Sequence, residues 1–157
     1  MFTTMLGVAI QVGIGWGETP TVWHSDYARA HAEACNGDKP LFIVICSKSS
    51  EYGQMASLGI FLSEALEKKL QADYVRFMID TDTAEGQKLA EQFDAGDAPH
   101  FVILDRSGKW QVFYQAGYLM ENDLAPVLAK HRRIKLTASG KVMQEVAQRP
   151  VVRVCST

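Results

Sequence analysis

Cysteine is scarce in this sequence of 157 residues. The 3 cysteines, Cys35, Cys46 and Cys155, are irregularly spaced, and no CxxC motif occurs. An odd number of cysteines without a regular pattern excludes a disulfide framework. The fold must therefore rest on an apolar core, which a chain of this length and 47% hydrophobic content can build as one domain. We interpret Cys155 as an unpaired thiol, with pairing between two chains as the alternative.

The sequence also lacks an excess of charge of either sign. Its formal net charge is -2, and it contains no run of like charges. Duplex nucleic acid requires a broad basic surface, and anionic lipid headgroups attract clustered basic residues. We therefore expect neither as a partner.

No apolar run is long enough to span a bilayer. The longest candidate, 5–16, carries Gln11 and three glycines and falls short of the necessary length. It matches the apolar region of a secretory signal in length, but no Lys or Arg precedes it and no clean cleavage motif follows. Two alternatives stay open: a periplasmic or secreted protein with a cleaved leader over 1–20, or a cytoplasmic protein that retains this segment.

The rest of the chain alternates between helical and strand patterns. A helix over 25–35 is predicted from Ser25 as the N-cap, and Gly37 is expected to end it in a left-handed conformation. The uninterrupted apolar run over 41–46 is typical of a strand covered on both faces. The further expected elements are a polar loop over 47–53, a helix over 57–70, a strand over 74–79, a helix after the capping box of Asp82 and Glu85, a turn over 95–99, strands over 101–104 and 110–114, and a helix over 122–131.

Several of these segments resemble the thioredoxin-like family whose members carry WCxxC. Trp23, the alanine-rich helix and Lys39-Pro40 before an apolar strand resemble the start of that domain. The segment 97–109, DAPHFVILDRSGK, resembles the second family signature, in which a cis-proline precedes a strand, and Gly117 falls where the family has a glycine before its last helix. The resemblance covers about 23–133. It implies a thioredoxin-like three-layer α/β/α sandwich with a mixed central sheet over 21–134, a C-terminal extension over 135–157, and a cis peptide bond before Pro99.

The sequence departs from this family at the residues that carry its chemistry. Depending on the register, the two family cysteines fall on Ser50 and Gly53 or on Ser49 and Tyr52. Disulfide exchange needs one thiolate to attack and a second to resolve the mixed disulfide, and a serine hydroxyl does neither. The aspartate that many relatives place in the first strand corresponds to Val44. We therefore expect no dithiol oxidoreductase activity.

Two residues remain as candidates for redox chemistry by a single thiol. Cys46 lies at the end of a predicted strand, and a following helix start would lower its pKa. His100, beside Pro99, could approach the same loop. The interpretation we favour is a core cysteine and a partly exposed histidine on the strand.

Other patterns give weaker indications. His31 and Cys35 are four residues apart on one helix, but two ligands do not make a zinc site, so we expect no metal and no cofactor. Asp80 and Asp82 are better explained as a strand-end residue and a helix cap than as an acid–base pair. No histidine–acid partnership accompanies the serines of 47–50.

Two function classes follow. The first is a non-catalytic module that binds a protein or extended peptide, because the family's groove beside the proline remains when the cysteines are lost. The second is a monothiol oxidoreductase that uses Cys46. The oligomeric state stays open. The residues predicted to form the peptide-binding surface are Ser49, Ser50, Tyr52, Ala98, Pro99 and His100.

Overall fold

One mixed sheet of four strands organises the part of the chain that the structure describes. In a computed structural model, residues 23–57 and 62–136 are described. The strands are β1 (Leu41–Cys46), β2 (Val75–Asp80), β3 (His100–Leu104) and β4 (Gln111–Ala116), in the order β2-β1-β3-β4. The β1–β2 pair is parallel, whereas β1–β3 and β3–β4 are antiparallel.

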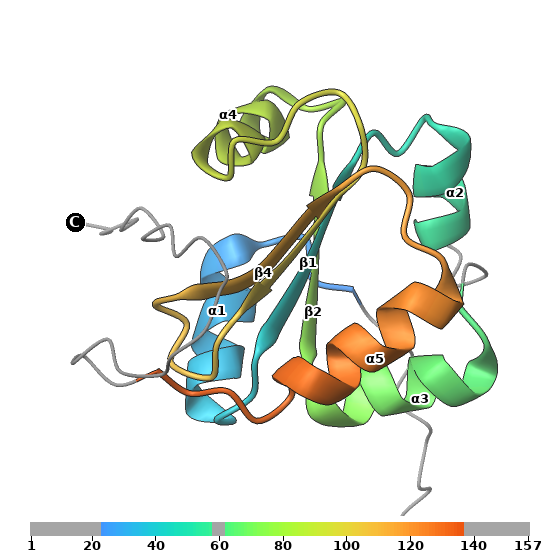
Figure 1. Cartoon of the computed structure of the whole chain (residues 1–157). Coiled ribbons are helices and arrows are strands. Elements are labelled where there is room, and N and C mark those ends of the chain that lie inside the picture. Colours follow the sequence, from blue (N-terminus) through green and yellow to red (C-terminus); the bar gives the residue numbers. More distant parts are fainter. Residues whose placement is uncertain (1–22, 58–61, 137–157) are drawn as a thin grey trace, which may run out of the picture.

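Five helices cover the two faces of this sheet (Figure 1). They are α1 (Tyr27–Asn36), α2 (Glu51–Ser57), α3 (Glu64–Asp73), α4 (Ala84–Gln92) and α5 (Glu121–His131). Ala30 of α1 and Ala90 of α4 pack on the face of β1 that carries Ile43 and Ile45. The other face of β1 packs against α2, α3 and α5, for example at Leu70 and Leu124. The predicted three-layer α/β/α sandwich with a mixed sheet is confirmed.

The apolar runs locate the strands to within two residues at each end. All six residues of β1 are buried, because helices cover both of its faces. The predicted β2 is displaced by one residue, to Val75–Asp80, and β3 begins one residue earlier than predicted, at His100, and ends at Leu104 as predicted. Within the described ranges, no helix has the length and apolar character needed to cross a membrane.

The ends of α1 and α4 differ from the prediction. Asp26, not Ser25, caps α1 by accepting a hydrogen bond from the amide of Arg29 at 2.9 Å. Gly37 has an ordinary right-handed conformation, and the left-handed residue is Asp38 with φ 49. The cap of α4 is Thr83, because the side chain of Asp82 binds a different loop.

The polar loop predicted over 47–53 is shorter than expected. Helix α2 begins at Glu51, and α3 begins at Glu64 after the cap Ser63. Residues 58–61 lie outside the described residues, as do the apolar segment over 5–16 and Cys155.

The peptide bond between Ala98 and Pro99 is trans, so the expectation of a cis bond was wrong. The trans isomer is the intrinsically favoured form of an X–Pro bond, by about 0.5–1 kcal/mol. In this conformation the carbonyl of Pro99 accepts a hydrogen bond from the amide of Gly117 at 2.8 Å. The loop that leads into β3 is thereby joined to the loop that follows β4.

Candidate functional site

The turn between β1 and α2, where the resemblance would place two cysteines, is closed by its own hydrogen bonds. The hydroxyl of Ser50 donates to the carbonyl of Ser47 at 2.6 Å and accepts from the amide of Gly53 at 3.0 Å. The hydroxyls of Ser47 and Ser49 lie 2.8 Å apart. Each of these serines thus satisfies the backbone or a neighbouring hydroxyl, which is the role that serines play in turns and helix caps.

Two carboxylates from the end of β2 hold this turn in place. Asp82 accepts a hydrogen bond from the amide of Ser49 at 2.8 Å, and Asp80 accepts one from the amide of Lys48 at 3.3 Å. Hydrogen bonds from the hydroxyl of Ser47 and from Ser49 lower the pKa of Asp82. Both aspartates therefore fasten the turn.

The second expected cysteine position is Gly53 or Tyr52, depending on the register. Neither position can hold an accessible thiol without a change in the surrounding structure. A Cβ atom at Gly53 would lie 2.0 Å from the carbonyl oxygen of Ser47, so any other residue would force the turn to move. Tyr52 is buried at 8% exposure, with its ring 5.8 Å from that of Phe101 and perpendicular to it. Burial, and then the neighbouring Cys46, raise the pKa of Tyr52.

Cys46 is a buried core residue, as the favoured interpretation held. Its exposure is 4%, and it packs in the same cluster as Tyr52 and Phe101. Burial first, and then the charges of Asp80 and Asp82, raise its pKa to about 11. A thiol of that acidity is almost fully protonated at neutral pH, and the thiolate is the reactive form.

His100 is buried as well, contrary to the expectation of a partly exposed side chain. It lies opposite Ile45 in the β1–β3 ladder, so its side chain shares the face of Ile45, whereas Cys46 belongs to the core on the other face. Its ring lies 5.5 Å from that of Tyr114. The structure therefore does not bring His100 and Cys46 together.

Two exposed residues in the loop before α5 follow no pattern in the sequence. Tyr118 is 70% exposed and Met120 is 67% exposed, and both lie in the loop between β4 and α5. The ring of Tyr118 lies 5.6 Å from that of Tyr52, so this loop contacts α2. Met55 on α2 is the third large apolar side chain that is exposed among the described residues. Periodicity could not have found Tyr118 and Met120, because exposure in a loop follows no repeat.

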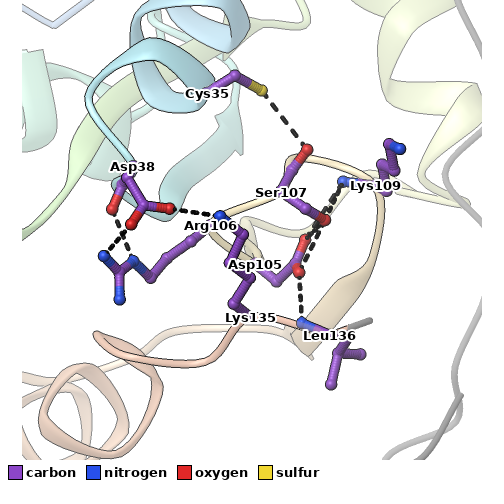
Figure 2. A network of polar contacts seen from close by, with 8 residues as sticks. All are labelled: Cys35, Asp38, Asp105, Arg106, Ser107, Lys109, Lys135 and Leu136. Atoms are coloured by element: carbon purple, nitrogen blue, oxygen red, sulfur yellow. Dashed lines mark hydrogen bonds and ion pairs between the residues drawn. The ribbon is translucent and has the colours of Figure 1, made fainter. Parts of the chain in front are cut away.

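The pair His31 and Cys35 lies at the hairpin between β3 and β4, on the opposite end of the sheet from the turn after β1. Figure 2 shows Cys35 beside this hairpin. The thiol of Cys35 donates to the carbonyl of Ser107 at 3.5 Å, and Nε2 of His31 donates to the carbonyl of Gly108 at 3.0 Å. Asp105, which is fully buried, accepts from the hydroxyl of Ser107 and from three amides of this region. In the described ranges, no three His, Cys, Asp or Glu side chains gather in a way that could hold a metal.

The layers, strand order and crossover define a thioredoxin-like α/β fold whose redox positions carry no cysteine pair. A thioredoxin from Thermus thermophilus is similar in structure, with a TM-score of 0.59 and 22% identity over 70% of this chain and 86% of its own. A DsbH oxidoreductase has a TM-score of 0.55 at 16% identity, covering 79% of this chain and 93% of that one. Thioredoxin NaTrxh from Nicotiana alata has a TM-score of 0.54 at 21% identity, covering 71% and 92%.

These similarities establish the fold alone. No protein-family model matches the sequence, and no curated protein matches it.

Proposed function

We propose that this chain is a non-catalytic thioredoxin-like module that binds an extended segment of another polypeptide. The observation that carries the proposal is the exposure of Met55 on α2 and of Tyr118 and Met120 in the loop that contacts α2 through Tyr118. Exposed aromatic and methionine side chains that gather in one place are typical of interaction sites.

We call the proposed site the docking surface and define it as Ser49, Met55, Ala98, Pro99, Tyr118 and Met120. Ser49 and Ala98 are exposed and Pro99 is partly exposed, so these three of the six peptide-binding residues proposed from the sequence are accessible to a partner. Ser50 shapes the turn, and Tyr52 supports Tyr118 from below. His100 is left out of the docking surface because its side chain is buried on the other face.

An extended peptide fits this surface for a physical reason. The docking surface lies where the strands end and includes Ala98 and Pro99 of the loop before β3, and an extended segment presents both its backbone and its alternate side chains to such a surface. The monothiol alternative has less support, because Cys46 is buried and its pKa is raised to about 11.

A library of random dodecapeptides displayed on phage tests the proposal. Peptides selected on the intact protein should bind the wild type and lose most of their affinity for Tyr118→Ala and for Ala98→Arg. Trp110→Ala, a change of an aromatic residue just past the β3–β4 turn at the opposite end of the sheet, is the matched control and should bind normally. Selected peptides that bind both surface variants as well as the wild type would show that the docking surface is not the binding site.

A further inference from the structure

The net charge of the chain is small, but acidic and basic residues are distributed unequally between the two ends of the sheet. One end is formed by the turn after β1, the loop after β2, the loop before β3 and the loop after β4, since β3 runs opposite to β1 and β2. In the described loops, first helical turns and α4 at this end, the Lys and Arg residues are Lys48, which pairs with Asp80 at 3.7 Å, and Lys88. The carboxylates of these loops and first turns are Glu51, Asp80, Asp82, Glu85, Asp94, Asp97, Glu121 and Asp123.

The opposite end is basic. It comprises the described segments 37–40, 73–74, 105–110 and 130–136, where the carboxylates are Asp38, Asp73, which pairs with Arg132 at 3.8 Å, and Asp105. Asp38 pairs with Arg106 and Lys135, which Figure 2 shows beside the hairpin. The Lys and Arg side chains at this end are Lys39, Arg106, Lys109, Lys130, Arg132, Arg133 and Lys135.

Three of the acidic side chains flank the docking surface directly. Glu51 precedes Met55 by one turn of α2, Asp97 adjoins Ala98, and Asp123 lies in the first turn of α5 after Met120. All three are exposed, and within residues 23–57 and 62–136 none of them forms an ion pair. Their charge is therefore available to a partner.

Tyr118 adds a second kind of attraction for a cation. Its ring is 70% exposed and is held against the buried ring of Tyr52, so it offers an ordered aromatic surface. Arg and Lys side chains bind such rings through the quadrupole of the π system, and carboxylates nearby strengthen the same preference. An apolar surface with a rim of free carboxylates and an exposed tyrosine is complementary to a partner that combines apolar and basic residues.

We propose that the partner of the docking surface is an extended polypeptide segment that carries Arg or Lys next to apolar residues. This inference rests on the proposed function and adds the chemistry of the partner. A second copy of the chain, with its basic end on the acidic end of the first, fits less well. The exposed large apolar side chains in the described ranges are Met55, Tyr118 and Met120, so the basic end has none of these to place on the docking surface.

The peptides selected from the dodecapeptide library supply the test. The Arg and Lys content of the selected pool should exceed that of the unselected library. For the tightest peptide, a synthetic copy with each Arg and Lys replaced by Gln should bind about tenfold more weakly at low salt, and raising the salt concentration should reduce this difference.

Charge variants of the intact protein locate the effect. The combination Glu51→Gln, Asp97→Asn and Asp123→Asn should weaken the basic peptide by about tenfold and leave its Gln copy unaffected. The control, Glu33→Gln with Glu91→Gln, removes two exposed carboxylates on α1 and α4, of which Glu33 pairs with His24, and should change the affinity by less than about twofold.

The outcomes separate this inference from the proposed function. Peptides that require Tyr118 but show no basic enrichment, and no response to the triple change at the docking surface, would overturn the inference and leave the proposed function standing. Peptides that ignore Tyr118 would overturn both. Sedimentation should give a monomer at low salt, and an oligomer abolished by the triple change would make a second copy the partner and overturn the inference.

Discussion

The rings of Tyr52 and Tyr118 lie 5.6 Å apart at an interplanar angle of 69°, one buried at 8% exposure and the other exposed at 70%. Tyr52 also contacts Phe101 in the centre of the sheet. The contact therefore links the core to the docking surface. Because one ring is buried and the other is exposed, substitutions of the two residues should affect the free energy of unfolding differently.

Tyr52→Ala should destabilise the protein by about 3 kcal/mol, because it removes a buried aromatic ring and leaves a cavity. Tyr118→Ala should change the free energy of unfolding by less than about 1 kcal/mol, since that ring is mostly in water. Urea denaturation followed by circular dichroism measures both. Equal losses for the two variants would contradict the assignment of Tyr52 to the core and Tyr118 to the surface.

Cys46 should react much more slowly with iodoacetamide at neutral pH than Cys35. The thiol of Cys46 is buried and its pKa is about 11, whereas Cys35 is exposed. Labelling in a Cys155→Ser background, followed by mass spectrometry of peptides, measures the two rates, and both cysteines should react alike in denaturant.

The protein should also fail to accelerate reduction of insulin by dithiothreitol, and turnover abolished by Cys46→Ser would establish the monothiol alternative instead.

His131 should make the fold less stable in mild acid. It is buried in α5, where Nδ1 donates to the carbonyl of Val127 at 2.7 Å and the ring lies 5.6 Å from that of Phe113. Burial lowers its pKa in the folded state below the value of about 6.5 in the unfolded chain. The unfolded chain therefore binds more protons, so this contribution to stability is present above about pH 6.5 and is lost as the pH falls through the folded pKa.

Thermal or urea unfolding between about pH 7.5 and pH 5.5 measures this dependence. His131→Gln should be less stable than the wild type at the upper pH and should show a shallower decline toward the lower one. A variant with the same slope as the wild type would assign the pH dependence to other groups.

The sequence predicts the sheet better than it predicts the candidate site. The run over 41–46 identifies β1 because a strand covered by helices on both faces has apolar residues at every position. The sequence did not predict helix α2, because its buried pair, Tyr52 and Ala56, four residues apart, is a short apolar signal directly after a run of polar residues. The trans bond at Pro99 and the exposure of Tyr118 depend on contacts between loops distant in the sequence, which neither composition nor periodicity reports.

Restoring two cysteines at Ser50 and Gly53 should not restore a thioredoxin-type dithiol. A Cβ at Gly53 would meet the carbonyl oxygen of Ser47 at 2.0 Å and the Cα of Lys48 at 2.8 Å, both of them backbone atoms that cannot rotate away. Gly53→Ala alone should therefore cost about 2 kcal/mol or more in the free energy of unfolding, as overpacked sites do. Gly96→Ala is the matched control, because no atom lies within 4 Å of its added Cβ, and its effect should stay within about 0.5 kcal/mol. The double cysteine variant should be less stable than the wild type and should reduce insulin no faster than background. A stable double variant with thioredoxin-like turnover would show that the turn after β1 readily adopts the redox geometry, and that the loss of the two thiols alone separates this protein from an oxidoreductase.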